Sequence, residues 1–359
     1  MPDTPGQEFA GTMPVPDRQR FDEAALARYL SAQVAGFRGP LTVEMFRGGQ
    51  SNPTFLLTSG DGAHYVLRRK PAGQLLPSAH AVDREFRITR ALFGHGVPVA
   101  EPLCLCEDQS VIGTMFYVMG YVRGRNFWDP RLPGLTNDER AAIYDEMNRV
   151  LVALHTADFV SLGLADYGKP GNYFARQIAR WSKQYRSSET EHIAAMEKLL
   201  TWLPANIPVG DETTLVHGDY RIDNMIFAPD QPRMLAVVDW ELSTLGHPLA
   251  DFSYHVMLWR VGAGEIPGLK GIDLASLGIP TEAEYVAAYC RRTRRAPIEP
   301  RIWEFCMAYN LFRIACIRQG IMKRVLEGTA ASRRAREAGE RARETAELAW
   351  QQVEERFGG

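Results

Sequence analysis

Apolar and polar residues alternate along much of the first third of the chain, as they do in strands with one buried face. Five such runs are bounded by Gly, Pro or polar turns, and they cover residues 41–50, 53–59, 60–70, 100–108 and 114–122. At the start of the third run, Asp61-Gly62 is a hairpin signal. Helical spacing over residues 21–35 and 80–93 predicts two short helices. We expect this part to be a mostly antiparallel sheet that carries a helix.

Beyond a change of composition near residues 122–129, the pattern becomes helical. Thr136 precedes acidic residues, which predicts a capped helix start. Helical runs follow over residues 169–188 and 189–207, and the last run, 332–357, is highly charged. Its apolar residues, on roughly one face, are Ala346, Ala349, Trp350, Val353 and Phe357. Because this face does not extend over several heptads, we expect a helix that docks on the rest of the chain rather than a coiled coil.

The composition is ordinary for a globular protein, with 359 residues, 45% hydrophobic and 23% charged, and a net charge of -2. This balance gives no reason to expect a nucleic-acid partner, and no run has the length of a membrane span. Residues 1–20, rich in Pro and Gly, lack a signal-peptide pattern and are expected to be a flexible lead-in. Five cysteines without metal-site spacing favour a reducing, cytoplasmic location. Cys104 and Cys106 share one strand face, where we expect core packing.

Residues 215–243 place three polar side chains, Asp219, Asn224 and Asp239, among apolar runs. Two strands so close in sequence can pair as a hairpin, which would bring Asn224 and Asp239 together beside Asp219. A carboxylate and an amide oxygen suit magnesium, which takes its other ligands from water and phosphates. A further Asp in the same loop can accept a proton from an attacking hydroxyl. The spacing therefore indicates phosphoryl transfer, with Asp219 as base and Asn224 and Asp239 as metal ligands.

In the order of its motifs the chain resembles the protein-kinase-like superfamily. Asp219 and Asn224, with four residues between them, match the catalytic loop, and Asp239 in VVDWE stands where protein kinases carry Asp-Phe-Gly. His-Gly before Asp219, in place of His-Arg, resembles the branch of aminoglycoside phosphotransferases and choline kinases. The resemblance covers residues 42–255 and fades toward the C-terminus.

This resemblance implies an α+β, two-lobe protein-kinase-like fold with ATP in the cleft. It implies an N-terminal ATP-binding lobe of antiparallel sheet plus helix at 21–119, and a mainly helical C-terminal catalytic and substrate-binding lobe at 120–359. The residues implied to bind ATP are Gly48, Gly49, Ser51 and Asn52 in a turn, Arg68 or Lys70 on a strand, Glu85 on a helix, and Met119, Tyr121 and Val122 beside the adenine. The family usually has Lys where this chain has Arg68, which aligns better than Lys70. Arginine can grip phosphate but is not equivalent to lysine, so ATP affinity or phosphate geometry is in question.

Three further residues acquire roles from the resemblance. Asp251 stands in the place of a buried Asp that accepts hydrogen bonds from the catalytic-loop backbone, and His217 is expected to hold that loop. Arg221 occupies the position of a phosphate-contacting Lys in protein kinases and is expected to stabilise the transferring group. No long activation segment follows Asp239, which favours a small-molecule acceptor over a protein.

The acceptor is therefore expected to be a small molecule with a hydroxyl group. Arginine is frequent in the C-terminal half, at Arg291, Arg292, Arg294, Arg295, Arg301, Arg313, Arg318 and Arg324. This abundance favours an anionic acceptor over a polycationic aminoglycoside. The stretches FRGGQSNPTFLL and GNYFARQIARWSKQYR resemble phosphotransferase-type domains found with acyl-CoA dehydrogenases. That similarity implies a hydroxyacyl-CoA or hydroxy acid as acceptor and a functional link to such a dehydrogenase.

Two alternatives stay open at this point. Within the enzyme class, an aminoglycoside or choline-type kinase would need an aromatic and acidic pocket for its cationic acceptor. In a different class, the chain would be a catalytically idle, nucleotide-binding regulator of a partner enzyme. Arg68 favours the idle regulator, whereas the intact Asp219, Asn224 and Asp239 oppose it.

Overall fold

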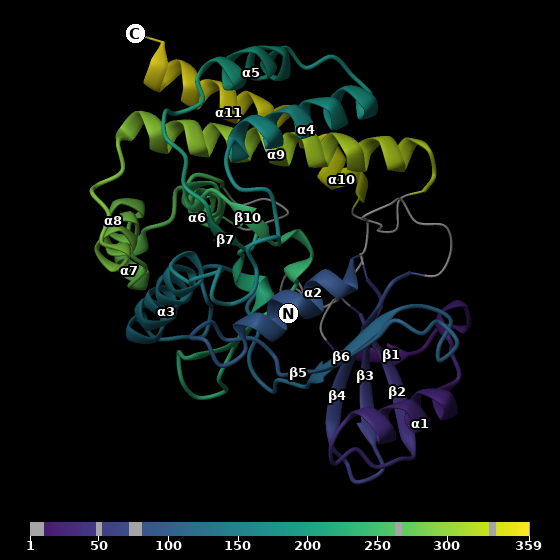
Figure 1. The fold of residues 1–359 in the computed structure, drawn as a ribbon. Helices are drawn as coiled ribbons and strands as arrows, with labels where there is room; N and C mark the ends of the chain where they lie inside the picture. The colour runs from purple at the N-terminus through teal and green to yellow at the C-terminus, as the bar shows by residue number, and fades with distance from the viewer. Residues whose placement is uncertain (1–10, 48–51, 72–80, 263–267, 330–334, 359) are drawn as a thin grey trace. The chain divides into compact units, whose positions relative to one another are not determined.

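The computed structural model describes residues 11–47, 52–71, 81–262, 268–329 and 335–358 (Figure 1). The chain divides into two compact units, each with its own packing. Unit 1 comprises Met1–Asp129, Val160–Leu164 and Ile222–Ser243, and unit 2 comprises Pro130–Phe159, Ala165–Arg221 and Thr244–Gly359. The units are defined by packing, so the expected lobe boundary at 119/120 stays a prediction.

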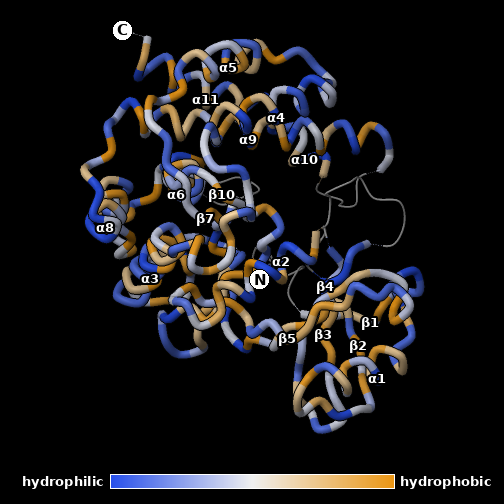
Figure 2. The backbone as a smooth tube through the Cα atoms, viewed as in Figure 1, coloured by the Kyte–Doolittle hydropathy of each residue, from blue (hydrophilic) through white to orange (hydrophobic). Residues whose placement is uncertain are grey.

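A six-stranded antiparallel sheet with the order β1-β2-β3-β4-β6-β5 forms most of unit 1. Its strands are β1 (Thr12–Pro14), β2 (Leu41–Phe46), β3 (Thr54–Ser59), β4 (His64–Arg69), β5 (Pro102–Cys106) and β6 (Phe116–Gly120). Hydrophobic residues are concentrated in these strands (Figure 2). Alternate residues of β3, Phe55 and Leu57, are fully buried, as the period of a strand requires. Helix α1 (Glu23–Gln33) buries Leu26 and Leu30 in the same core.

The predicted antiparallel sheet is confirmed, and so are its hairpin and its cysteine face. The Ser59 N–H donates to the Ala63 carbonyl at 2.9 Å, and Gly62 has a φ of 85°, which suits the Asp61-Gly62 turn. Cys104 and Cys106 are buried in one hydrophobic cluster. All five cysteines are free and buried, so they act as core residues.

The segment expected to be a flexible lead-in contributes ordered structure from Thr12 onward, which corrects that expectation. Strand β1 pairs with β2, and the Thr12 hydroxyl donates to Glu44 at 2.9 Å. Arg69 donates to the backbone carbonyl of Gln19 at 2.9 Å. Proline is tolerated in an edge strand, where one N–H faces away from the ladder, so Pro14 does not prevent pairing. Residues 1–10 lie outside the described residues.

A second, two-stranded sheet in unit 1 carries the metal-ligand candidates. Strands β8 (Met225–Phe227) and β9 (Met234–Val237) pair antiparallel, with Met225 opposite Val237. The chain therefore leaves Asn224 and Asp239 at the same end of this hairpin, as predicted. The short 3-10 helices η3 (Ile222–Asn224) and η4 (Trp240–Leu242) flank the pair. In the same unit, helix α2 (Val82–Leu92) packs against η4 and against β5 and β6.

Unit 2 is mainly helical, with one small sheet. Strand β7 (Thr214–Val216) pairs antiparallel with β10 (Thr244–Gly246). The helices are α3 (Asn137–His155), α4 (Tyr173–Ser188), α5 (Ala194–Ala205), α6 (Pro248–Val256), α7 (Leu274–Leu277), α8 (Glu282–Thr293), α9 (Pro300–Leu326), α10 (Ala335–Glu340) and α11 (Ala342–Phe357), and the 3-10 helix η5 (Met257–Trp259) follows α6. Thr136 caps α3 in a capping box with Glu139, which confirms the predicted helix start.

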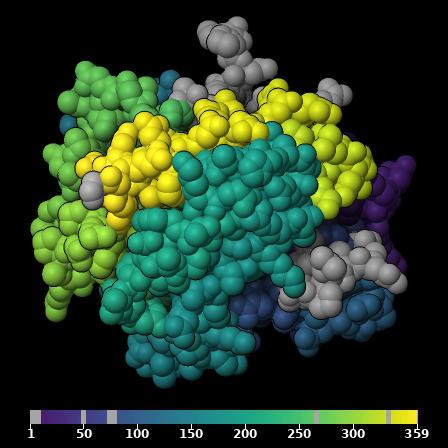
Figure 3. Space-filling view, turned by 90° about the horizontal axis from the view of Figure 1, so that it is seen from above, coloured from purple at the N-terminus to yellow at the C-terminus, as the bar shows by residue number. Residues whose placement is uncertain are grey.

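Helix α9 is the central element of unit 2, because α4, α6, α10 and α11 all pack against it. Helix α11 also packs on α5, and Ala346, Ala349 and Val353 of the predicted apolar face are buried. The expectation of a docking helix at the C-terminus is confirmed. Figure 3 shows the surface of α4 and α5 lying directly against the C-terminal helices. In the part of the chain that the structure describes, no helix combines the length and the apolar character needed to cross a membrane.

Candidate active site

Arg68, at the end of strand β4, is the centre of a charge cluster in unit 1. Its Nε lies 2.8 Å from Glu85 Oε2, and its Nη2 lies 2.6 Å from Asp239 Oδ1. The contact with Glu85 is an ion pair rather than an aligned hydrogen bond, because the N–H direction is unfavourable. Glu241 Oε2 lies further away, 3.6 Å from Nη2. The expected pairing of a strand cation with Glu85 is thus made by Arg68.

Lys70, the alternative cation, has a different partner. Its Nζ lies 3.6 Å from Asp83 Oδ1, and both side chains are partly exposed. Arg68 is buried, and although burial alone would lower the pKa of its guanidinium, the carboxylates of Glu85 and Asp239 raise it. Burial raises the pKa of Glu85, with Arg68 acting in the opposite direction. Arg68 is therefore a permanently charged group held by two carboxylates.

Two polar side chains complete the surroundings of Glu85. Asn52 is fully buried and donates its Nδ2 hydrogen to Glu85 Oε1 at 2.7 Å. The Tyr117 hydroxyl donates to Glu85 Oε2 at 3.2 Å. We expect Asn52 to contact phosphate; its side-chain amide is engaged with Glu85, and the phosphate contact stays a prediction. Sequence reasoning missed Tyr117, which the strand pattern of β6 marks only as a buried position. Gly48, Gly49 and Ser51 lie outside the described residues, so their phosphate contacts stay predictions.

The predicted metal ligands lie at adjacent ends of paired strands. The Val238 N–H donates to the Asn224 carbonyl at 2.9 Å, which ties the loop before β8 to the loop after β9. Asp239 has a φ of 66°, in the left-handed region that few residues other than Gly adopt. Backbone strain of this kind accumulates at functional sites. A carboxylate and an amide oxygen are the kind of donor set that Mg²⁺ prefers, so Asn224 and Asp239 fit the predicted metal chemistry.

Asp219, the predicted base, lies in unit 2 in the loop after β7. The Tyr254 hydroxyl donates to its Oδ1 at 2.5 Å, and Arg221 Nε lies 3.2 Å from the same oxygen. Only 20% of the Asp219 side chain is exposed. Burial would raise the pKa of this carboxyl, but Arg221, the Tyr254 hydroxyl, His217 and Arg313 together lower it. The carboxylate is therefore ionised at neutral pH and able to accept a proton.

Asp251 on helix α6 holds the backbone of this loop, as predicted. Its Oδ2 accepts a hydrogen bond from the His217 N–H at 2.7 Å, and its Oδ1 accepts one from the Gly218 N–H at 2.8 Å. Sequence reasoning missed His155, whose Nε2 lies 3.2 Å from Asp251 Oδ2. The Nδ1 atom of His217 accepts the Asp219 N–H at 3.2 Å, so the imidazole of His217 supports the loop. Both expectations for this loop are confirmed.

The expected adenine-binding residues lie at the end of strand β6 and just beyond it. Met119 pairs with Val66 in the sheet. Tyr121 is 38% exposed, and its ring lies 5.7 Å from that of His64. Met119 belongs to strand β6, and Tyr121 and Val122 follow its end. None of these contacts tests what the three residues bind, so an adenine site stays a prediction.

Several of the arginines that favoured an anionic acceptor have structural partners in unit 2. Arg292 Nη2 lies 2.7 Å from Asp145 Oδ1, and Arg295 Nη2 lies 2.5 Å from Glu212 Oε2. Arg313 is buried and donates to the Gly218 carbonyl at 2.6 Å. Their number in the sequence therefore overstates the positive charge available to a substrate.

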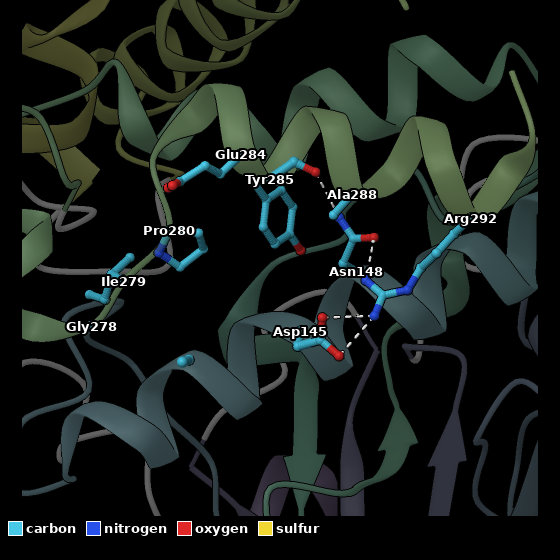
Figure 4. Close-up of a pocket in the computed structure, with 10 residues that line it drawn as sticks. Asp145, Asn148, Gly278, Ile279, Pro280, Glu284, Tyr285, Ala288 and Arg292 are labelled. Carbon is cyan, nitrogen blue, oxygen red and sulfur yellow. Dashed lines mark hydrogen bonds and ion pairs between the residues drawn. The ribbon is translucent and has the colours of Figure 1, made fainter. Parts of the chain in front are cut away.

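A cavity of about 340 Å³ lies between α3 and α8 in unit 2 (Figure 4). Arg292 crosses it and joins Asp145 and Asn148, and Asn148 donates to the Tyr285 carbonyl at 3.0 Å. The other polar side chains of the lining also have protein partners: Glu284 accepts from the Thr281 N–H at 2.8 Å, and the Tyr285 hydroxyl lies 2.8 Å from His255 Nε2. The predicted catalytic and metal-binding residues lie instead in the two clusters around Arg68 and Asp219.

The model of the phosphotransferase enzyme family matches residues 42–303, most of the chain. The chain belongs to this family. A crystal structure from Ralstonia eutropha, of a protein provisionally named an aminoglycoside phosphotransferase, is 54% identical with a TM-score of 0.86, and the match covers 94% of this chain and 99% of that one. This family fold is protein-kinase-like, and the predicted fold class and family are confirmed.

More distant solved structures share the fold alone. A choline kinase from Cryptosporidium parvum has a TM-score of 0.63 at 11% identity, over 93% of this chain and 96% of that one. An aminoglycoside phosphotransferase in a ternary complex with ADP and hygromycin B has a TM-score of 0.58 at 16% identity, over 92% of this chain and 98% of that one.

Curated relatives carry a different name. Acyl-CoA dehydrogenase family member 10 of Mus musculus is 47% identical over 343 residues, which cover 94% of this chain and 32% of the relative. Family member 11 of Mus musculus is 46% identical over 328 residues, 89% of this chain and 42% of the relative. The chain therefore spans less than half of the length of these curated relatives.

Proposed function

We propose that this phosphotransferase-family chain moves the γ-phosphoryl group of ATP to a hydroxyl group of a small molecule, in a magnesium-dependent reaction. The observation that carries the proposal is the state of Asp219: a largely buried carboxylate, kept ionised by its neighbours, on a loop whose backbone is held by Asp251. A positioned, ionised carboxylate can accept the proton of an attacking hydroxyl. The charge cluster of Arg68, Glu85 and Asp239 supplies the groups proposed to bind the phosphates of ATP and the magnesium ion.

In this reaction the acceptor oxygen forms a bond to the γ-phosphorus, and the bond from that phosphorus to the bridging oxygen of ADP breaks. The acceptor proton passes to Asp219, which also orients the hydroxyl. Arg221, 3.2 Å from Asp219 Oδ1, offsets charge on the transferring group. Arg68 binds the phosphates while Glu85 holds its side chain. Asn224 and Asp239 would hold magnesium, which when bound offsets the charge that develops on the phosphate oxygens.

The acceptor that the relatives suggest is a hydroxyacyl-CoA or a related hydroxy acid. Two curated relatives at 46–47% identity are named acyl-CoA dehydrogenases, and the part of them that matches this chain is of the phosphotransferase family. A phosphotransferase and an acyl-CoA dehydrogenase in one protein are expected to act on related compounds. The acceptor of the phosphotransferase would then be an acyl group that carries a hydroxyl. A functional link of this chain to an acyl-CoA dehydrogenase is part of the same proposal.

The test is acceptor-dependent release of ADP from ATP and magnesium, measured across hydroxyacyl-CoAs, free hydroxy acids, choline and kanamycin. Asp219→Asn is expected to bind nucleotide but to lose the acceptor-dependent release, and Asp239→Ala to lose it as well. Asp138→Asn, an exposed residue in the first turn of α3, is the matched control and keeps the wild-type rate. Full activity in Asp219→Asn contradicts the assignment of the base.

One observation favours a second candidate, a nucleotide-binding regulator without catalysis. Arg68 replaces the lysine usual in the family, and its Nη2 is paired directly with Asp239. Binding of magnesium-ATP with no acceptor-dependent release from any member of the panel is the outcome that selects the regulator.

A further inference from the structure

Helix α6 brings a tyrosine hydroxyl onto the candidate base. Tyr254 is buried, and its hydroxyl donates to Asp219 Oδ1 at 2.5 Å. A phenol is a stronger donor than a serine hydroxyl, and its ring restricts it to one direction. Arg221 Nε approaches the same oxygen at 3.2 Å. With both contacts on Oδ1, rotation of the carboxylate about its Cβ–Cγ bond is restrained.

Helix α9 brings a guanidinium to the same loop. Arg313 Nη2 donates to the carbonyl of Gly218, the residue before Asp219, at 2.6 Å. The guanidinium carbon lies 4.9 Å from the centre of the Tyr254 ring and 5.7 Å from that of Trp181. Arg313 therefore contacts both the backbone of the loop and the side chain that binds its carboxylate.

The burial of Arg313 is costly, which points to a specific role. Arg313 is 7% exposed and donates to the Gly218 carbonyl, and among the described residues no carboxylate lies within ion-pair distance of it. A buried guanidinium without a carboxylate partner loses hydration that one carbonyl and two aromatic faces only partly replace. Its positive charge also favours the ionised form of Asp219. A neutral residue would hold the packing of α9 without this cost.

We propose that Tyr254 and Arg313 are positioning residues for Asp219, with Tyr254 fixing the direction of the carboxylate and Arg313 fixing Tyr254 and the loop carbonyl. Neither residue needs to touch the acceptor or ATP. The catalytic meaning of this arrangement rests on the proposed function, whereas the arrangement itself can be measured without any turnover.

The first experiment follows the carboxyl carbon of Asp219 by ¹³C NMR over a pH series, with Asp219→Asn identifying the signal. The groups that face this carboxylate are Arg221, His217, Arg313 and the Tyr254 hydroxyl. Tyr254→Phe removes one of them and keeps the ring against Arg313, so the titration midpoint of Asp219 is expected to rise by about one pH unit. An unchanged midpoint in Tyr254→Phe overturns the proposal.

Tyr144→Phe is the matched control for this measurement. Tyr144 is also fully buried, and its hydroxyl donates to the Pro130 carbonyl at 2.6 Å, away from the loop of Asp219. The Tyr144→Phe variant loses a buried tyrosine hydroxyl from the same unit as Tyr254. The titration midpoint of Asp219 is expected to stay at the wild-type value in this variant. A shift as large in Tyr144→Phe as in Tyr254→Phe would show that the effect is a general response to a lost hydroxyl.

The second experiment measures kinetics with the acceptor that supports ADP release. Tyr254→Phe is expected to lower kcat at least about tenfold with little change in KM for ATP, because a misaligned base affects the transfer and not nucleotide binding. The acidic limb of the pH profile of kcat in Tyr254→Phe moves to higher pH.

Arg313→Lys, which keeps the charge, is expected to retain more activity than Arg313→Gln. Equal activity of wild type and all three variants overturns the proposal. If wild type itself releases no ADP, the proposed function fails, and the NMR result still decides the positioning.

Discussion

Arg68 Nη2 lies 2.6 Å from Asp239 Oδ1, so the cation of strand β4 and the carboxylate after strand β9 form a direct ion pair in unit 1. Glu85 on α2 binds the other side of the same guanidinium. Three elements distant in the sequence are thus held by one side chain. Arginine can make both contacts at once because its donors point in several fixed directions, which the single ammonium of a lysine cannot reproduce.

We expect Arg68→Ala to reduce the free energy of unfolding by about 3–5 kcal/mol, since it leaves Glu85 buried without its cation. The measurement is urea denaturation at pH 7. The double variant Arg68→Met/Glu85→Leu is expected to recover part of this loss, because Glu85 no longer leaves an unpaired buried charge, although Asn52 and Tyr117 lose it as their acceptor. A double variant less stable than Arg68→Ala would contradict this reading of the pair.

Lys70→Ala provides the comparison that separates the two strand cations. Lys70 Nζ lies 3.6 Å from Asp83 Oδ1, and both side chains are partly exposed. Losing this contact is therefore expected to lower the free energy of unfolding by about 1 kcal/mol or less. In an ATP-binding titration, Arg68→Ala is expected to weaken affinity much more than Lys70→Ala. The reverse order would show that Lys70 holds the phosphates.

The backbone of Asp239 leads to a second prediction. At a φ of 66°, a Cβ atom is unfavourable by about 1 kcal/mol, so Asp239→Gly is expected to be more stable than Asp239→Ala. Both variants lose the same carboxylate, and the difference isolates the backbone. Asp145, in the interior of helix α3, is the control: there Ala is expected to be more stable than Gly by about 1 kcal/mol. Thermal unfolding of the four variants checks whether the order reverses between the two positions.

The sequence predicted the elements and the motif residues, because alternation and motif spacing are local properties. It could not predict which side chains meet when the partners are far apart in the chain. Asn52 and Glu85 are 33 residues apart, and Arg313 and Gly218 are 95 apart. A periodic pattern identifies a buried face but not the partner of a polar atom on it. For the same reason, counting arginines did not reveal that Arg292, Arg295 and Arg313 have structural partners, and the charge of the acceptor stays a prediction.

Asp251 leads to a prediction about acid. Although burial opposes it, the hydrogen bond and charge of His155, with the His217 backbone, lower the pKa of Asp251 below its ordinary value. A lowered pKa in the folded state gives stability that is present above the unfolded value of about 3.9 and is lost as the pH falls through the folded value. We expect Asp251→Asn to be about 3–5 kcal/mol less stable at pH 7 and to lack this part of the acid dependence.

Urea denaturation at pH 7, 4 and 3 measures that difference, with Asp145→Asn as the control. Asp145 is 63% exposed in its side chain and pairs with Arg292 at the surface, so its loss is expected to change stability by about 1 kcal/mol or less. If the free energy of unfolding falls with pH by the same amount in wild type and in Asp251→Asn, the role given to Asp251 is contradicted.

His255 is expected to make the folded state sensitive to mild acid. Its Nδ1 faces the Tyr220 carbonyl at 3.2 Å, which can only accept, so Nδ1 carries the proton, and its Nε2 accepts from the Tyr285 hydroxyl at 2.8 Å. Burial lowers the pKa of His255 to about 4, whereas the pKa of a histidine in the unfolded chain is about 6.5. Between these values the unfolded state holds more protons, so stability falls as the pH falls from about 6.5 toward 4.

His255→Asn is expected to show a shallower fall over this range in urea denaturation, whereas His64→Asn, at an exposed position on β4, keeps the wild-type slope. An unchanged slope in His255→Asn would show that this imidazole does not titrate with unfolding.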